Sequence, residues 1–196
     1  MSGTACLRTA GGDRLPLPGH RWLGEADALE RALLASLTGP VLDIGCGPGR
    51  HVVALAELGL PALGIDVTPA ALRSARRRGA TVLQRSVFGR VPGAGRWPSA
   101  LLLDGNVGIG GDPVTLVRRV GLLLRPGGRL LVETGPPGSG GDVRIVTLEI
   151  DGRSGPWFEW ASVGADEAVG LARDAGMATA TVEERSGRWF AWLECR

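Results

Sequence analysis

A glycine-rich loop is the part of this sequence whose residue types and spacing could most directly do chemistry. In VLDIGCGPGRH, residues 41–51, a buried-looking apolar run leads into Gly45, Gly47 and Gly49 and then into a helix. Such a turn at the carboxyl end of a first parallel strand lets the backbone approach a ligand closely. Asp66 lies 21 residues after Gly45 and ends the next predicted strand, where a carboxylate can accept hydrogen bonds from both hydroxyls of a ribose. The pattern predicts a site for a ribose-containing cofactor.

Three details of the loop distinguish between such cofactors. Its glycines are spaced G-x-G-x-G, whereas dinucleotide sites have the spacing G-x-G-x-x-G. Pro48 removes a backbone N–H group from a loop that would otherwise cradle a phosphate. Asp43, inside the strand, would repel a pyrophosphate but suits a ligand with an ammonium or sulfonium group. The loop therefore favours a cationic ligand over a nicotinamide or flavin dinucleotide.

At these motifs the sequence resembles the class I S-adenosylmethionine-dependent methyltransferases. VLDIGCGPGR matches the first motif of that family, and LGIDVTPAAL matches the second. ATVLQRSVF occupies the third region, where Ser86 replaces the acidic residue that the family often has. ALLLDGN and LLRPGGRLLVE occupy the fourth and fifth regions, so the motifs extend over roughly residues 25–134.

The resemblance implies a doubly wound, Rossmann-like α/β fold with a mostly parallel sheet and a reversed terminal hairpin strand. It implies S-adenosylmethionine as cofactor and S-adenosylhomocysteine as product. The methionine part would lie against Asp43 and the glycine loop, and the ribose against Asp66. Val67 would pack on the adenine face, with Ser86 and Val87 at its edge. The cofactor-binding positions implied in this way are Asp43, Gly45, Cys46, Gly47, Gly49, Asp66, Val67, Ser86, Val87 and Asp104.

The loop after the fourth predicted strand, DGNVGIGGDP, is the expected place of the transferable methyl group. Ligands of open α/β sheets bind outside the carboxyl ends of the strands, at the switch in strand order. Asn106, the only asparagine in the chain, could orient substrate or cofactor through its amide, or could simply tolerate a left-handed turn. His20, His51, Asp104 and Glu133 are the candidates for a general base, and none of them stands out. We take His20, His51, Asp104 and Asn106 as the candidate catalytic residues.

Aromatic residues late in the chain indicate the kind of acceptor. Phe158 and Trp160 share one face of a predicted strand, and Trp160 is a candidate substrate contact or else part of the core. Such a lining suits an apolar or aromatic small molecule. The loop after the fourth strand lacks the N/D-P-P-aromatic signature of enzymes that methylate amino groups of nucleic-acid bases or of glutamine, which makes those acceptors less favoured.

The elements that must position these residues follow from the hydrophobic pattern. Short apolar runs alternate with helical patterns, which predicts a parallel sheet covered on both faces. Strands are expected at 41–44, 62–65, 81–83, 100–103 and 129–133, and helices at 25–37, 49–58, 69–79, 112–124 and 165–175. Thr68-Pro69 and Asp112-Pro113 read as helix starts. After a flexible connector at 135–142, strands are expected at 144–150 and 157–162 and, as a terminal hairpin, at 178–184 and 188–194.

The chain as a whole reads as one domain, residues 1–196, in which 1–24 is an N-terminal segment and candidate lid and 135–163 is an inserted hairpin region near the substrate site. No apolar run is long enough for a membrane span, the N-terminus lacks the order of a signal peptide, and Cys6, Cys46 and Cys195 form no metal-ligand spacing. We expect a soluble, cytoplasmic protein without a metal.

A formal net charge of +2 argues against nucleic acid as a partner. The absence of Lys and the abundance of Ala, Gly, Arg and Pro suggest a GC-rich, bacterial genome. The leading hypothesis is methyl transfer to a small molecule, such as a specialised metabolite. A nicotinamide-dependent oxidoreductase, a non-catalytic cofactor-binding partner protein and a different use of the same cofactor stay open, as does the oligomeric state.

Overall fold

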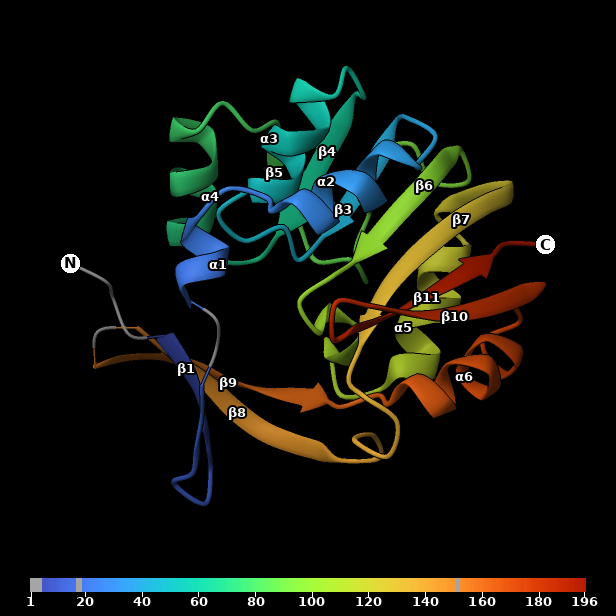
Figure 1. The fold of residues 1–196 in the computed structure, drawn as a ribbon. Coiled ribbons are helices and arrows are strands. Elements are labelled where there is room, and N and C mark those ends of the chain that lie inside the picture. Colours follow the sequence, from blue (N-terminus) through green and yellow to red (C-terminus); the bar gives the residue numbers. More distant parts are fainter. Residues whose placement is uncertain (1–4, 17–18, 151) are drawn as a thin grey trace.

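The computed structural model describes residues 5–16, 19–150 and 152–196, which form two β-sheets and the helices around them (Figure 1). The larger sheet has seven strands in the order β10-β11-β7-β6-β3-β4-β5. Its strands are β3 (Val41–Ile44), β4 (Ala62–Asp66), β5 (Val82–Gln84), β6 (Trp97–Leu102), β7 (Leu124–Thr134), β10 (Thr179–Arg185) and β11 (Arg188–Glu194). The first five in this sequence order run parallel, whereas β11 is antiparallel to β7 and β10 to β11. This confirms the predicted fold class.

Helices cover both faces of this sheet because alternate strand residues are apolar on both sides. Leu42 and Ile44 face α5 and α6, while Val41 faces α2 and α3 on the other side. α4 packs against β5. The helices are α2 (Ala28–Ala35), α3 (Arg50–Glu57), α4 (Pro69–Arg77), α5 (Pro113–Gly121) and α6 (Ala168–Asp174), with single 3-10 turns at η1 (Asn106–Gly108) and η2 (Ala165–Glu167). Within the described residues, no helix is both long enough and apolar enough to cross a membrane.

Several helix boundaries differ from the sequence expectation, and two of these differences have a clear local reason. The first predicted helix begins later because Asp27 caps α2 and forms a capping box with Glu30. The helix expected to reach residue 124 ends at Gly121, since Leu124 already pairs with Trp97 as the start of β7. The segment RPGG then lies inside β7 at a register shift, instead of turning the chain before the strand.

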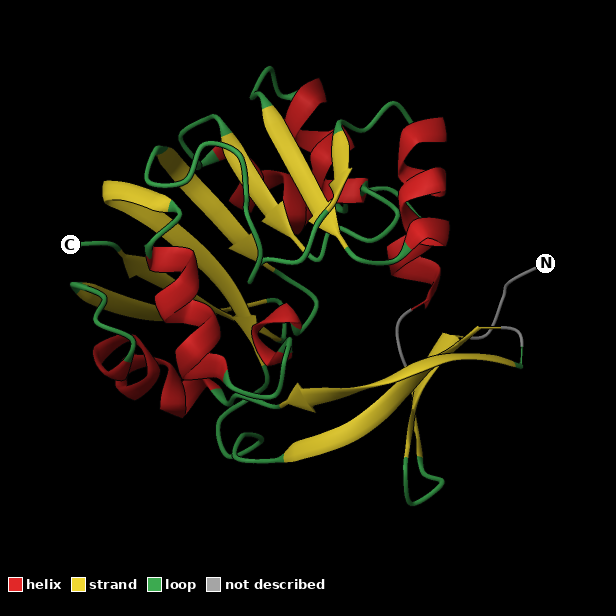
Figure 2. Ribbon diagram, turned by 180° about the vertical axis from the view of Figure 1, so that it is seen from behind, coloured by secondary structure: helices red, strands yellow, loops and turns green. Residues whose placement is uncertain are grey.

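The smaller sheet has four antiparallel strands in the order β2-β1-β8-β9. These strands are β1 (Ala5–Thr9), β2 (Arg14–Pro16), β8 (Val143–Ile150) and β9 (Arg153–Ala161), and the short helix α1 (Gly19–Leu23) follows β2. The hairpin of β8 and β9 is the one expected from the sequence. The pairing of β1 with β8 was not expected, because it joins segments more than 130 residues apart. Figure 2 shows this sheet at the end toward which the parallel strands point.

The end of β9 packs against the loop that follows β6. Ile109 and Trp160 form an isolated antiparallel bridge between the two segments. A Cβ atom at Gly108 would lie 2.1 Å from the carbonyl oxygen of Ala161, so only glycine allows this close approach. The smaller sheet is thereby fixed at the carboxyl edge of the larger one.

Replacing Gly108 with alanine is expected to destabilise the protein by about 1–3 kcal/mol, because the added Cβ forces the loop and β9 apart. Gly170→Ala is the matched control: Gly170 lies in α6 with only a distant arginine nitrogen near its Cβ position, so this change should stabilise by about 0.5–1 kcal/mol. Thermal and urea unfolding measure both effects. A Gly108→Ala protein as stable as the wild type would show that the contact between β9 and the loop is not close.

Candidate functional site

The glycine loop leaves β3 at the carboxyl edge of the larger sheet and enters α3. Gly45, Gly47 and Gly49 have φ values of +73°, +51° and +82°, which side-chain-bearing residues rarely adopt. The N–H groups of Gly45 and Cys46 both donate to the carbonyl oxygen of Ile65, at 2.8 and 3.1 Å. The loop is therefore sharply bent and fastened to β4.

Asp66 sits across this loop at the end of β4. Its Oδ2 accepts a hydrogen bond from the N–H of Gly47 at 2.9 Å, and its Oδ1 accepts one from the N–H of Thr68 at 2.7 Å. Each carboxylate oxygen keeps a further lone pair for a ligand. A Cβ atom at Gly47 would meet nothing within 4 Å, so this side of the loop faces open space. Asp66 and Gly47 thus lie together beside room for a ligand.

Cys46 contributes only its backbone to the loop. Its side chain is buried in an apolar cluster with Val52 and Leu72, and its Sγ lies 2.6 Å from the position that a Cβ atom at Gly64 would take. Burial raises the pKa of this thiol above its usual value. The side chain is therefore a packing group and the thiol is not a nucleophile.

The segment after β5 lies beside the end of β4. The N–H of Arg85 donates to the carbonyl oxygen of Asp66, and Val67 and Ser86 are exposed next to it. Val87 is buried in the core and is held by Arg119, whose Nε donates to its carbonyl oxygen at 2.9 Å. The Oγ of Ser86 accepts a hydrogen bond from the following Phe88 N–H rather than from a distant group.

Asp43 is a buried carboxylate with an unsatisfied oxygen. It is 1% exposed, and within the described part of the chain its Oδ2 has no hydrogen-bond partner. The nearest cationic candidate is Nδ1 of His51 at 4.0 Å. Burial raises the pKa of Asp43 to about 6, and the negative charges of Asp104 and Asp66 add to this, while His51 and Arg50 act against it. Burying the charged form of Asp43 costs free energy, and no hydrogen bond to Oδ2 from the described residues offsets this cost.

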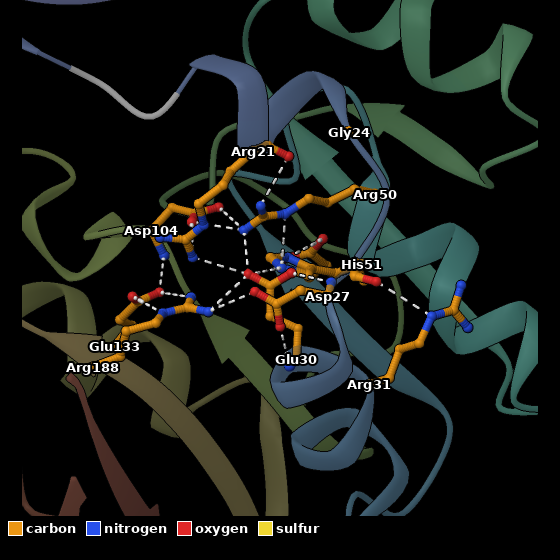
Figure 3. A network of polar contacts seen from close by, with 12 residues as sticks. Arg21, Gly24, Asp27, Glu30, Arg31, Arg50, His51, Asp104, Glu133 and Arg188 are labelled. Carbon is orange, nitrogen blue, oxygen red and sulfur yellow. Dashed lines mark hydrogen bonds and ion pairs between the residues drawn. The ribbon is translucent and has the colours of Figure 1, made fainter. Parts of the chain in front are cut away.

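A buried group of charges lies next to the loop, and Arg50 is at its centre (Figure 3). Arg50 is 3% exposed, and its Nη2 lies 2.7 Å from both carboxylate oxygens of Asp104 and 2.9 Å from Oε1 of Glu30. Its Nη1 donates to the carbonyl oxygen of Arg21 at 3.0 Å, and its Nε donates to Nε2 of His51 at 3.1 Å. One side chain in the first turn of α3 therefore holds α1, α2 and the loop after β6.

The same group continues toward the terminal strand. Arg188 donates to both carboxylate oxygens of Glu133 at 2.9 Å and lies 3.1 Å from Glu30. Burial alone would raise the pKa of Glu30, but His51, Arg50 and Arg21 hold it below its usual value. We call Arg21, Glu30, Arg50, Asp104, Glu133 and Arg188 the charge cluster. It pairs three guanidinium groups with three carboxylates.

The candidate catalytic residues lie in different surroundings. His51 is 4% exposed and faces Asp43 and Glu30 within the helix packing, and the carboxylate of Asp104 is held by Arg50. Asn106 donates through Nδ2 to the carbonyl oxygens of Ile44 and Gly45. His20 lies in α1, but its side chain is outside the described residues.

On the acceptor side, Trp160 is half-buried, and its Cζ2 lies 3.8 Å from the Cβ position of Gly105. The sequence analysis did not predict that Arg21, Glu30 and Arg188 belong to the charge cluster beside the site. The capping-box pattern Asp27-x-x-Glu30 is a sequence signal that could have drawn attention to Glu30.

Comparisons with known proteins agree with this geometry. Residues 41–128 match the family model described as methyltransferase domain. This segment contains the glycine loop and Asp66, so the chain carries a methyltransferase domain at the site described above. It is therefore a methyltransferase whose cofactor is S-adenosylmethionine. A comparison with curated protein sequences finds no match.

Solved methyltransferase structures share the fold. One from Bacteroides fragilis, in complex with S-adenosylhomocysteine, is 24% identical over 97% of this chain and 86% of its own, with a TM-score of 0.81. A 1,6-didemethyltoxoflavin N1-methyltransferase from Burkholderia thailandensis is 21% identical over 86% and 77% of the two chains, with a TM-score of 0.61. An amino pentose methyltransferase from Micromonospora echinaspora is 20% identical over 90% and 94%, with a TM-score of 0.64.

The site of this methyltransferase has chemical features that fit the cofactor. S-adenosylmethionine carries an ammonium group, and the unsatisfied, buried Oδ2 of Asp43 is an acceptor that such a cation would satisfy. The open side of Gly47 leaves room beside Asp66, whose remaining lone pairs suit ribose hydroxyls.

Replacing Asp43 with asparagine is expected to stabilise the cofactor-free protein at pH 8. Burial raises the folded-state pKa of Asp43 to about 6, above the usual range of an aspartate, so the contribution of this residue to stability is most favourable below about pH 4 and is lost as the pH rises through 6. The amide of asparagine has no charge to bury, so the free energy of unfolding of the variant should exceed that of the wild type by roughly 1–3 kcal/mol at pH 8. This difference should shrink toward pH 4. Denaturant unfolding at both pH values measures it.

The same variant should bind S-adenosylhomocysteine more weakly than the wild type. In calorimetric titrations, wild-type affinity should fall as the pH drops below 6, because the cation needs the ionised carboxylate, and the Asp43→Asn protein should bind weakly at every pH. Unchanged affinity together with lower stability at pH 8 would contradict this role for Asp43.

Proposed function

We propose that this methyltransferase transfers the methyl group of S-adenosylmethionine to a small-molecule acceptor. The observation that carries the proposal is the position of β9: Trp160 lies against the loop after β6, at the carboxyl edge of the parallel sheet. Acceptors of open α/β sheets bind at this edge. Trp160 forms a T-shaped pair with Phe158, with ring centroids 5.9 Å apart, and the pair offers an aromatic wall to an acceptor.

The similar solved structures support this class of acceptor. The Burkholderia thailandensis enzyme was solved with 1,6-didemethyltoxoflavin, and the Micromonospora echinaspora enzyme acts on an amino pentose. Both are small molecules. We further propose that the protein is a cytoplasmic bacterial enzyme of one domain, residues 1–196, and that its acceptor is a specialised metabolite. The net charge of +2 supports the proposal that the acceptor is not a nucleic acid.

The cofactor's position in the proposal follows the loop geometry. Asp43 pairs with the ammonium group, and the loop from Gly45 to Gly49, with the backbone of Cys46, holds the methionine part. Asp66 accepts hydrogen bonds from the ribose. The exposed Val67 packs on the adenine face, and Ser86 lies at its edge, while the buried Val87 supports that edge.

Methyl transfer depends mainly on how the acceptor is positioned relative to the methyl group. When bound, the cofactor supplies a methyl group on a positively charged sulfur, and S-adenosylhomocysteine is a good leaving group because it departs as a neutral thioether. The residues of this chain then have to exclude water and align the acceptor. Asp104 and His51 are held by Arg50 in the present arrangement, so we propose that they fix the site. His20 stays a candidate contact of the acceptor, whereas Asn106 donates both amide hydrogens to the backbone and would act by positioning the glycine loop.

Incubation of the wild-type protein with S-adenosylmethionine and a panel of amino sugars, heteroaromatic amines and phenols tests the proposal. We expect formation of S-adenosylhomocysteine that depends on one of these small molecules, and none with RNA, DNA or protein. Turnover only with a macromolecule would contradict it.

Trp160→Ala should lower kcat/KM for the acceptor at least tenfold and leave the affinity for S-adenosylhomocysteine within twofold. Trp157→Ala is the matched control, because Trp157 lies on the opposite face of the same strand, 47% exposed beneath Arg8. Equal kcat/KM values for the Trp160→Ala and Trp157→Ala variants would show that Trp160 is not part of the acceptor site.

A further inference from the structure

One side chain ties the loop after β6 to the glycine loop. The Nδ2 atom of Asn106 donates to the carbonyl oxygen of Ile44 at 2.9 Å and to that of Gly45 at 3.0 Å. A primary amide has two N–H hydrogens, so its donor capacity is fully used. The two carbonyl groups belong to the last residue of β3 and the first residue of the glycine loop, where the chain turns toward the cofactor site.

The geometry allows this contact in one orientation only. Turning the amide over would place Oδ1 against two carbonyl oxygens, which repel it. A Cβ atom at Gly45 would lie 2.7 Å from Nδ2 and 2.9 Å from Cγ of Asn106, so the glycine makes room for the amide as well as adopting a positive φ. Since the Gly45 N–H donates to the carbonyl oxygen of Ile65, the peptide between Ile44 and Gly45 is held by β4 on one side and by the loop after β6 on the other.

The other contacts of this loop lead to the proposed acceptor wall. Asp104 and Gly105 have φ values of +57° and +77°, and this turn brings Asn106 back over the end of β3. Three residues later, Ile109 bridges to Trp160 on β9. Residues 105–111 therefore contact the cofactor loop on one side and the acceptor wall on the other.

We infer that Asn106 is a positioning residue for methyl transfer: it holds the glycine loop in its cofactor-binding conformation and couples that loop to residues 105–111. The inference rests on the proposed function. Because coupling between two sites is reciprocal, cofactor binding should order residues 105–111, and an ordered 105–111 loop should strengthen cofactor binding.

Two variants and one control test the coupling. Asn106→Ala removes both donors, and Asn106→Asp keeps the size and turn preference of the residue but turns a carboxylate oxygen toward the two carbonyl groups. The control is Asp112→Ala, at the far end of the same loop. This variant loses the cap of α5, in which the Thr115 N–H donates to Oδ1 of Asp112 at 2.9 Å, and should lower stability by a comparable amount.

Calorimetric titration with S-adenosylhomocysteine is the first measurement. We expect at least a tenfold loss of affinity for both Asn106 variants and less than a twofold change for Asp112→Ala, although its melting temperature falls. Hydrogen exchange is the second measurement: S-adenosylhomocysteine should slow exchange of the 105–111 amides in the wild type and the control, but not in Asn106→Ala or Asn106→Asp.

Affinity equal to wild type in both Asn106 variants, or ligand protection of 105–111 that persists in them, would overturn the inference and leave the proposed function standing. A wild-type protein that does not bind S-adenosylhomocysteine would overturn the proposed function and the inference together.

Discussion

The buried guanidinium group of Arg50 is the constraint on which the arrangement of this site depends. A buried charge must be paired and hydrogen-bonded, because removing it from water otherwise costs several kcal/mol. Arg50 meets this requirement with Asp104 on one side, Glu30 on another and the carbonyl oxygen of Arg21 on a third. These partners come from the loop after β6, from α2 and from α1, so three separate segments must converge on the first turn of α3. Because that turn directly follows Gly49, the same interaction fixes where the glycine loop ends.

The site combines this charge-paired cluster with a buried carboxylate that has no ion-pair partner closer than 4.0 Å. Asp43 is as buried as its neighbours, yet one of its oxygens has no partner among the described residues, and its pKa is raised to about 6 by burial. Proteins commonly accept lower stability at functional positions where a ligand later supplies the missing interaction. The charge cluster keeps its own charges paired with one another, which leaves the carboxylate of Asp43 without a close cation in the described residues. Under the proposed function, Asp43 binds the cation of the cofactor, while the neighbouring carboxylates of the cluster stabilise the fold.

The sequence was sufficient for the parallel sheet, the sharply bent glycine loop and the methyltransferase domain, because each depends on local patterns: alternation of apolar runs, glycine spacing, and caps such as Asp112-Pro113. It was not sufficient for features that depend on distant pairings. The first strand, Ala5–Thr9, is short and has no periodicity of its own, and its partner β8 lies near the other end of the chain. Likewise, Arg21 and Arg188 are ordinary arginines in an arginine-rich sequence, and only the fold brings them to Glu30. Asn106 stood out by its rarity, but its two carbonyl partners could be known only from the structure.

A crystal structure of the protein with S-adenosylhomocysteine tests the central claim most directly, because it shows which group the unsatisfied carboxylate serves. The account predicts that the ligand's amino group is hydrogen-bonded to Oδ2 of Asp43, either directly at about 3 Å or through one ordered water, with the ribose hydroxyls on Asp66 and the glycine loop unchanged. A complex in which the ribose lies away from Asp66, or in which the amino group points away from Asp43 and leaves that carboxylate unpaired, would contradict it.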